Sequence, residues 1–337
     1  MTRPEGILKV ATVALLCLCA IANPGLVLAE ADWSSLTFDN DLFIGNDSGY
    51  TSGVFYSWYD TPENNKAEIG FLARTMKWSL TDRDSVKSEV SSKTIGQSIV
   101  TPDDITLENP PLPPEDLPYA GLLFYTDAWI KAYADRAEKI TVTLGIVGEY
   151  SFAEETQTFV HKILGGDEPE GWDTQLNDEI VFQFSRAQIW RSWISSDRHS
   201  DILLGADAAL GTISSSVGVT AMYRYGRQLQ HSFPTALLLT SRSSNPVAVL
   251  SGWFLFAGVH AHYMPNQIFL DGNTFDNDGQ ESMEYDNEAI GVTAGIAYAW
   301  QNYSLTFAIS DLNLIEDNDE TGEYFQFGTL TLAWKHD

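Results

Sequence analysis

Hydrophobic and polar positions alternate with a period of two over most of the chain. In residues 290–300 every second side chain is apolar and the run ends in Tyr298 and Trp300, whereas the positions between them are Gly, Ala or Thr. Residues 303–310 repeat this pattern, and only Gln301 and Asn302 separate the two segments. Such alternation is typical of a β-strand with two different faces, and a two-residue connection predicts a hairpin.

Three further segments, 217–225, 253–263 and 330–334, carry an apolar face with aromatic residues at its ends. This pattern is typical of a transmembrane β-barrel, whose outer surface contacts lipid. All backbone polar groups inside lipid must be paired, and a closed sheet achieves this. A soluble β-sandwich also alternates and is the alternative. Segments of ten or more residues with recurring aromatic ends favour the barrel.

We predict an all-β fold, an antiparallel transmembrane β-barrel of about twelve strands with a short helix in an outer loop. The predicted strands are 34–41, 50–60, one ending near 100, 118–133, 138–149, 179–194, 200–212, 216–227, 248–263, 287–301, 303–313 and 324–335. The number is even, as in bacterial single-chain barrels. With the N-terminus in the periplasm, the outer loops are 42–49, 101–117, 150–178, 213–215, 264–286 and 314–323. Segments 61–90 and 228–247 are exceptions to the short inner turns.

Residues 1–29 have the features of a secretory signal peptide. Arg3 and Lys9 flank the start of an apolar run, and Val27-Leu28-Ala29 forms a small-residue cleavage site. The predicted mature domain is residues 30–337, a single barrel without cysteine, because Cys17 and Cys19 both lie in the signal. Export and the barrel pattern together predict a location in the bacterial outer membrane.

Charge narrows the range of partners. The chain has 19 Lys and Arg against 46 Asp and Glu, a formal net charge of −27. Removal of the signal leaves 17 basic and 45 acidic side chains. No basic cluster could replace the counterions of a phosphate backbone, so we expect no binding to nucleic acid. Acidic runs at 271–281 and 316–323 fall in predicted outer loops.

The predicted outer loop 150–178 contains the main candidate for catalysis. Ser151-Phe152-Ala153-Glu154 has the form of a helix capping box, and Gln157 and His161 then lie four residues apart on one helix face. An acidic stretch follows at 167–170. A histidine facing such a stretch is a candidate general base beside a divalent cation site. A solvated loop histidine is the other interpretation.

His260 and His262 share a face of another predicted strand. Their spacing could ligate a metal, but no Cys or carboxylate pattern accompanies them. We therefore expect them to line the lumen or the rim of the barrel.

Several motifs occur in a fixed order across residues 33–180. They are Phe38-Asp39-Asn40-Asp41-Leu42-Phe43, Tyr50-Thr51-Ser52-Gly53, Gly96-Gln97-Ser98-Ile99-Val100-Thr101-Pro102, Asp116-Leu117-Pro118-Tyr119-Ala120-Gly121, Gln157 with His161-Lys162-Ile163-Leu164-Gly165, and Gly171-Trp172 with Gln175-Leu176. This set resembles the outer-membrane lipid A 3′-O-deacylase (LpxR-like) family. The C-terminal half matches that family only as a generic barrel.

The resemblance implies a calcium-dependent carboxylic ester hydrolase that removes the 3′-linked acyloxyacyl group from lipid A in the outer leaflet. Carried over by position, His161 is the catalytic base, with Asn40, Thr51 and Gln157 as supporting polar residues of the site. Asp41 and Asp167 take the places of the calcium ligands. Ester hydrolysis requires an activated nucleophile and a stabilised oxyanion, which a histidine and a hard cation would supply. We expect the protein to act as a monomer.

The sequence departs from the family pattern at a few positions, which affects the expected substrate more than the fold. Asp178 stands where the family often has Asn, Asp116-Leu117-Pro118 replaces Asp-Arg-Pro, and 101–108 lacks a lysine that some members have. One alternative function is an esterase acting on phospholipid or another acylated lipid. A second is a non-catalytic barrel, either a scaffold or a porin, although twelve strands leave little open lumen.

Overall fold

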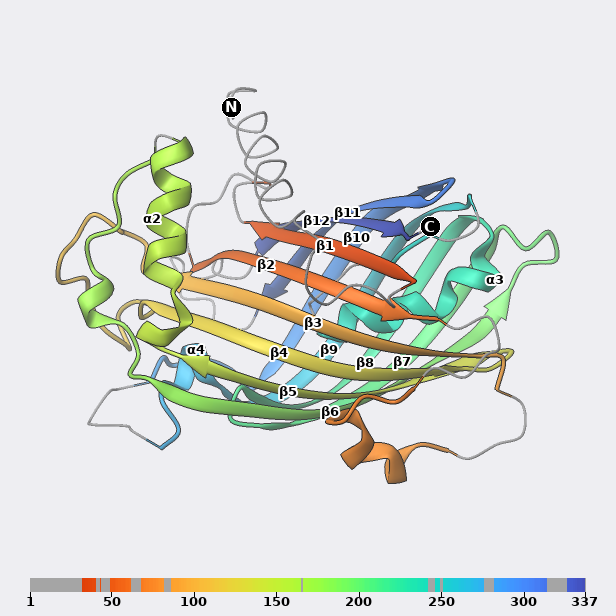
Figure 1. The fold of residues 1–337 in the computed structure, drawn as a ribbon, viewed down its shortest axis with the longest axis horizontal. Helices are drawn as coiled ribbons and strands as arrows, with labels where there is room; N and C mark the ends of the chain where they lie inside the picture. Colours follow the sequence, from red (N-terminus) through yellow and green to blue (C-terminus); the bar gives the residue numbers. More distant parts are fainter. Residues whose placement is uncertain are drawn as a thin grey trace.

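The strands close into one antiparallel barrel in the computed structural model of the chain (Figure 1). The structure describes residues 32–40, 43, 49–61, 68–81, 86–164, 166–241, 246–248, 251–275, 282–313 and 326–336. Its strands are β1 (Trp33–Asn40), β2 (Gly49–Asp60), β3 (Ser88–Thr101), β4 (Ala120–Ala132), β5 (Arg136–Val147), β6 (Glu179–Ile194), β7 (Ser200–Gly211), β8 (Ser214–Arg227), β9 (Trp253–Gln267), β10 (Glu288–Trp300), β11 (Tyr303–Asn313) and β12 (Gln326–Lys335). They pair in chain order, and β1 closes the barrel on β12, which confirms the predicted fold.

The helical elements are short. They are η2 (Ala73–Ser79), η3 (Glu149–Ser151), α2 (Ala153–Leu164), η4 (Trp172–Thr174), α3 (Leu229–Ser232), η5 (Phe233–Ser241) and α4 (Ile268–Asp271). In the part of the chain that the structure describes, none of these helices has the length and apolar character needed to span a membrane. The predicted signal, residues 1–29, lies outside the described residues and stays a prediction.

The two faces of the wall follow the period-two pattern. On β10, Ile290 and Ile296 are exposed on the outside, whereas Ala297 and Ala299 are buried toward the lumen. The predicted hairpin is confirmed, because β10 pairs with β11 up to Trp300 and Tyr303. An apolar outer surface of this kind is what a barrel presents to lipid.

Strand β9 differs from its predicted bounds of 248–263. It begins later, at Trp253, because Pro246 and Ala248 are buried with a segment that folds into the lumen. It continues through Pro265 to Gln267, since the pairing register shifts between Tyr263 and Asn266. The shift takes Pro265, which has no N–H, out of the hydrogen-bonded ladder.

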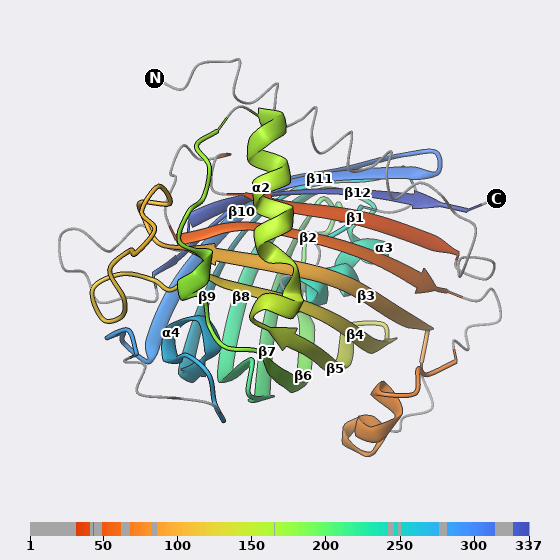
Figure 2. The same cartoon turned by 60° about the vertical axis from the view of Figure 1, so that its left-hand side comes forward.

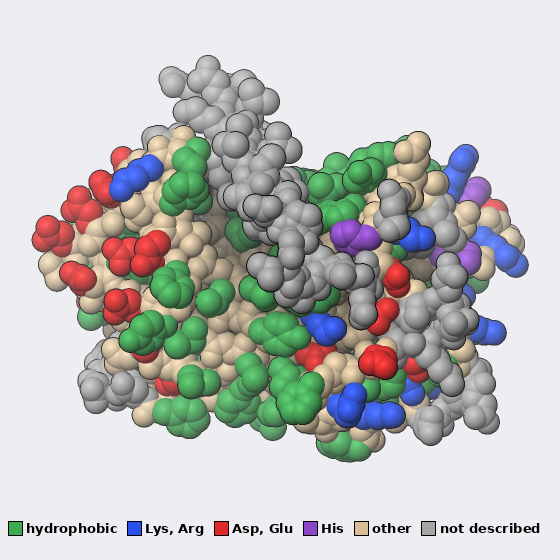
Figure 3. All heavy atoms as spheres, in the orientation of Figure 1, with side chains coloured by type: hydrophobic (Ala, Val, Ile, Leu, Met, Phe, Trp, Pro, Cys, Tyr) green, Lys and Arg blue, Asp and Glu red, His purple; other side chains and the backbone are tan. Residues whose placement is uncertain are grey.

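The connections define two rims. Loops 102–119, 148–178 and 268–287 lie at one end, which we call the outer rim. Turns 133–135 and 301–302 and the described chain ends lie at the other, the inner rim. Figure 3 shows Asp and Glu side chains gathered around the outer rim and Lys and Arg toward the inner rim. Of the two predicted acidic runs, the structure describes only residues 271–275. Residues 276–281 and 316–323 lie outside the described residues.

Aromatic side chains surround the outer surface near the inner rim. Neighbouring rings of this girdle lie 5.8 to 6.4 Å apart between centroids. Its members are Tyr56, Trp58, Tyr125, Tyr225, Trp253, Tyr298, Trp300, Tyr303 and Trp334. Tyr and Trp prefer the boundary between lipid and water, so the girdle indicates the level of one membrane interface.

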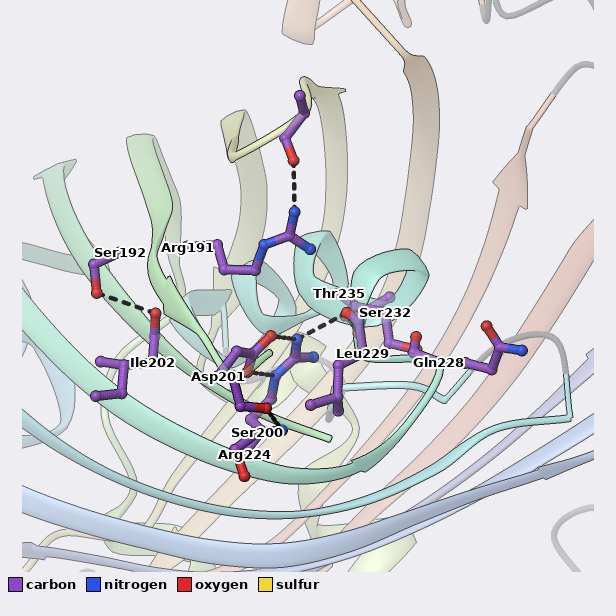
Figure 4. A network of polar contacts seen from close by, with 12 residues as sticks. Arg191, Ser192, Ser200, Asp201, Ile202, Arg224, Gln228, Leu229, Ser232 and Thr235 are labelled. Atoms are coloured by element: carbon purple, nitrogen blue, oxygen red, sulfur yellow. Dashed lines mark hydrogen bonds and ion pairs between the residues drawn. The ribbon is translucent and has the colours of Figure 1, made fainter. Parts of the chain in front are cut away.

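A segment between β8 and β9 fills the inner end of the lumen. We call it the plug (229–241 and 246–248); its apolar side chains pack with the lumen-facing residues of the wall. Figure 4 shows Arg224 of β8 paired with Asp201 of β7 at 2.7 Å and donating to the Leu229 carbonyl at 2.9 Å. Lys139 of β5 donates to the Leu237 carbonyl at 2.7 Å. The plug explains why this connection is not a short turn.

Candidate functional site

The helix α2 lies on the outside of the barrel wall at the outer rim. In Figures 1 and 2 it begins at the outer end of β4 and rises past β3 toward the ends of β2 and β1. Ala153, its first residue, is buried with Ile99 of β3, and a Cβ built on Gly121 of β4 would come within 2.2 Å of the Ala153 Cβ. Gln97 of β3 donates to the Ser151 carbonyl at 2.6 Å. These contacts hold the start of α2 directly against the wall.

The predicted capping box at Ser151 is wrong. Ser151 belongs to the preceding turn η3, and Phe152 adopts the left-handed conformation with φ 58°, so the helix begins one residue later. The Ser151 hydroxyl points to Gly121, where a Cβ would meet it at 2.1 Å, and has no hydrogen-bond partner in the described part of the chain. Packing against the wall therefore outweighs the local capping preference.

Trp172 of η4 fixes the middle of α2. Its indole Nε1 donates to Gln157 Oε1 at 2.9 Å, and both side chains are buried. The Trp172 ring also packs on Tyr119, with 4.8 Å between centroids. Burial raises the pKa of Tyr119 to about 12, which keeps its hydroxyl protonated as the donor to the Ile105 carbonyl. Gln157 thus lies beneath the helix, where it orients the helix rather than meeting solvent.

His161 lies one helical turn beyond Gln157 and is half-buried. Its Nδ1 is 2.6 Å from the backbone carbonyl oxygen of Asp167. A carbonyl can only accept, so Nδ1 is the donor, and in the neutral imidazole Nε2 is the nitrogen left to accept a proton. The N–H of Gly166 donates to the His161 carbonyl at 3.1 Å, which brings the chain back beneath the imidazole. The Asp167 carboxylate itself is exposed.

A row of paired residues connects the predicted N-terminal site residues to the start of α2. Asn40 pairs with Ser52, Ser52 with Ile99, and Ile99 with Gly121. Directly opposite residues share a face of the sheet, so Asn40 is on the outer face at the level where α2 begins. Asn40 is buried there.

Thr51 falls at an irregularity of the wall. The register of β2 against β3 shifts between Tyr50 and Ser52, so Thr51 is the extra residue of a β-bulge. Bulges are frequent beside active sites, where they change the direction of a side chain. The backbone of Thr51 is described, but its side chain is not. Asp41 lies outside the described residues.

The described residues form no complete metal centre. Among them, no group of three or more His, Cys, Asp or Glu side chains lies close enough to hold an ion. The two predicted calcium ligands, Asp41 and Asp167, are nonetheless both carboxylates, and Asp167 is exposed. Oxygen donors suit a hard cation such as calcium.

Gln97, Tyr119, Gly121 and Trp172 belong to the ordered motifs, but their residue types indicate no function. The structure shows that these four residues hold α2. Their signal was their position in the ordered motifs, since none of them carries chemistry that would single it out as catalytic.

The lumen holds a second polar cluster, separate from α2. A cavity of ≈ 210 Å³ lies between the plug and an apolar layer around Met264 and Phe269. His262 lies in its lining with Asp207, and the pair is 3.6 Å apart. The ring centroids of His260 and His262 are 5.5 Å apart. His262 is therefore a lumen residue, as expected for this pair of histidines.

Comparison with known proteins places this geometry in a family. The family model described as "Outer membrane protein LpxR" matches residues 9–336 of the chain. Among solved structures, LpxR from Salmonella typhimurium has a TM-score of 0.70 at 14% identity, over 90% of this chain and 100% of that one. The β domain of the Bordetella autotransporter BrkA has a TM-score of 0.40 at 7% identity, covering 91% and 98%. The translocator domain of NalP from Neisseria meningitidis has 0.38 at 8% identity, covering 98% of each chain.

No curated protein sequence matches the chain. The family match covers nearly the whole sequence, and the barrel of Salmonella LpxR has the same fold. The helix on the outer wall and the motif residues that hold it lie within the matched region. This chain belongs to the LpxR family of outer-membrane proteins.

Proposed function

We propose that the protein is a calcium-dependent hydrolase of the outer membrane that removes the 3′-linked acyloxyacyl group from lipid A. The observation that carries the proposal is the hydrogen bond from His161 Nδ1 to the Asp167 carbonyl. It fixes the tautomer and leaves Nε2 to accept a proton. This is the arrangement that a general base requires, with a second group orienting the imidazole.

The reaction we propose is direct hydrolysis by water. His161 Nε2 takes a proton from water, and the water oxygen attacks the ester carbonyl carbon. The tetrahedral intermediate then releases the sugar hydroxyl, and His161 returns the proton to that leaving oxygen. When bound by Asp41 and Asp167, calcium would supply positive charge for the oxyanion. Asn40 and Thr51 would add polar contacts, while Gln157 would hold the helix in place.

The location of the site favours a substrate in the outer leaflet. α2 lies outside the wall at the outer rim, and its Phe159 and Ile163 side chains are exposed. A lipid in the membrane could therefore reach His161 from the side, without entering the lumen. Lipid A is the acylated lipid of that leaflet, and the ordered motifs resemble those of its 3′-O-deacylases. An esterase that acts on phospholipid is the alternative outcome of the test.

The test is mass spectrometry of lipid A from cells with the full-length protein, with His161→Ala and with no protein. We expect the wild type alone to remove one acyloxyacyl unit. His199→Ala is the matched control, because His199 is an exposed histidine in an inner-rim turn. Purified protein should lose turnover in excess chelator and regain it with calcium. An unchanged lipid A spectrum with the wild type, or turnover that survives the chelator, would contradict the corresponding part of the proposal.

A further inference from the structure

A patch of charged side chains lies on the lipid-facing side of the wall near the inner rim. On β4 and β5, Thr126 and Lys139 line the lumen cavity, so their neighbours Asp127 and Glu138 point outward by alternation. Arg186 of β6 contacts Glu138 on this outer side. Uncovered charges facing hydrocarbon would be costly.

These charges are nevertheless buried, because residues 68–81 cover them from outside. Asp127 is 1% exposed and Glu138 is 0% exposed. The backbone N–H groups of Leu72 and Ala73 donate to Asp127 Oδ2 at 2.9 and 3.2 Å. At the other end of the segment, the Thr81 N–H donates to Glu138 Oε2 at 3.1 Å. We call this segment, which includes η2, the plate.

The inner face of the plate also packs on apolar residues of the wall. Ala73 is buried against Trp129 and Ile140, with Met76 and Leu80 beside them. The Ser79 carbonyl accepts from Arg186 Nε at 3.4 Å. The plate is therefore held by hydrogen bonds at both ends and by apolar contact in the middle. Figure 1 shows it, in orange, outside the barrel below β5 and β6.

The plate carries two aromatic and two basic side chains that are exposed. Phe71 and Trp78 are 82% and 84% exposed, the highest values among the large hydrophobic side chains that the structure describes. Arg74 and Lys77 are exposed between them, and the Lys77 Nζ lies 5.9 Å from the ring centroid of Trp129 on the wall, at the edge of the plate. This combination of aromatic and basic residues is typical of segments that lie in the boundary between lipid and water.

The position of the plate on the barrel indicates what contacts its exposed aromatic side chains. Trp129, which the plate packs on, lies on the same outer face of β4 as Tyr125 of the aromatic girdle. Trp129 lies four residues nearer the inner rim than Tyr125, so the plate continues the outer surface from the girdle toward the inner rim. Lys and Arg at that level can contact lipid phosphates. At the inner rim, the lipid is the phospholipid of the periplasmic leaflet.

We propose that the plate inserts Phe71 and Trp78 among phospholipids of the periplasmic leaflet, with Arg74 and Lys77 contacting their phosphates. The plate would seal the charged patch from lipid and anchor the inner rim. This interaction is separate from α2 and the proposed hydrolysis, which lie at the opposite rim.

Spin labels can test the depth of the plate. Because the only cysteines are Cys17 and Cys19, a full-length chain with both changed to Ser accepts single labels through Phe71→Cys or Trp78→Cys. In vesicles of phosphatidylethanolamine and phosphatidylglycerol, we expect oxygen to collide with both labels several-fold more often than a water-soluble nickel chelate. Ile296→Cys on the lipid-facing wall is the membrane control, and Asp197→Cys in an exposed inner-rim turn is the aqueous control.

A double variant, in which both basic residues are replaced, tests their role. Arg74→Gln with Lys77→Gln should make the label at 78 shallower in anionic vesicles but leave it unchanged in phosphatidylcholine. Heat-modifiable gel mobility checks that each variant is a folded barrel. Labels at 71 and 78 that behave like the Asp197 control would overturn the proposal. So would labels that neither reagent reaches, because they would indicate coverage by protein.

Discussion

At the scale of single residues, the candidate site is defined by what each polar atom contacts. The sequence places His161 and Asp167 six residues apart, with His161 expected as the base and the Asp167 carboxylate as a calcium ligand. The structure instead joins the imidazole to the Asp167 backbone carbonyl. The Asp167 carboxylate is exposed, so it stays available as a cation ligand. This division of roles between main chain and side chain depends on the loop conformation after Leu164, which no residue pattern encodes.

Trp172→Phe tests the support of the helix. Phenylalanine keeps the ring contact with Tyr119 but removes the N–H that donates to Gln157 Oε1. A buried acceptor left unpaired costs about 1–3 kcal/mol. If that cost weakens the productive position of α2, we expect turnover to fall roughly tenfold. Trp193→Phe, at an exposed position of β6, is the control and should hydrolyse at the wild-type rate. Equal rates in the two variants would contradict a positioning role for Trp172.

Asp116 makes the loop at the outer rim sensitive to pH. Its carboxylate accepts from the N–H groups of Leu117 at 2.7 Å and Asp103 at 3.2 Å, and burial raises its pKa from 3.8 to about 6. Between these values the unfolded loop loses the proton while the folded loop keeps it. The contribution of Asp116 to the stability of the loop is therefore greatest below pH 3.8, falls as the pH rises toward 6 and is constant above it.

Hydrogen exchange of the 102–119 amides checks this prediction. After correction for intrinsic rates, we expect protection in the wild type to decline from about pH 4 to about pH 6.5. Asp116→Asn cannot ionise and should show a flat profile over that range. A decline of the same size in both proteins would assign the effect to other groups.

At the scale of elements, the strands could be predicted far better than the segments between them. β6 and β11 have the predicted bounds, because alternation at period two is imposed by a wall with lipid on one side and a packed lumen on the other. The plate falls within 61–90 and all of the plug but residue 248 within 228–247, the two stretches that did not fit short turns. Neither has a strand or long-helix period, since each owes its shape to tertiary contacts with the wall.

Gly121→Ala tests whether α2 must lie directly on β4. The added methyl group would come within 2.2 Å of the Ala153 Cβ, so the helix has to move away from the wall. Overpacking of this kind costs about 1–3 kcal/mol, and we expect turnover to fall roughly 5- to 100-fold. Gly205→Ala on β7 is the matched control, because its Cβ would be 3.5 Å from the nearest atom. Activity and folding can be measured together by lipid hydrolysis and heat-modifiable mobility. A Gly121→Ala protein as active as the control would show that the contact is dispensable.

At the scale of the whole molecule, the barrel separates three regions with different surroundings. α2 lies outside the wall at the outer rim, the plate lies outside it at the inner rim, and the lumen between them is filled at both ends. The average hydropathy near zero concealed this separation, because apolar outer faces and polar loops cancel in the mean. The order of the motifs could indicate the candidate residues, but only the barrel shows that α2, which carries His161, lies outside the lumen.

This separation predicts that hydrolysis does not depend on an open lumen. In planar bilayers we expect the wild type to show no steady single-channel conductance, since the plug and the layer around Phe269 fill the two ends. Replacing 229–248 by a short Gly-Ser linker should make conductance events more frequent while lipid hydrolysis stays near the wild-type rate. Should that variant fail to fold, Leu237→Arg adds a cation to the buried plug near Lys139 and should loosen it. Steady conductance in the wild type would favour the porin alternative. Loss of hydrolysis in a folded, conducting variant would place the reaction inside the lumen instead.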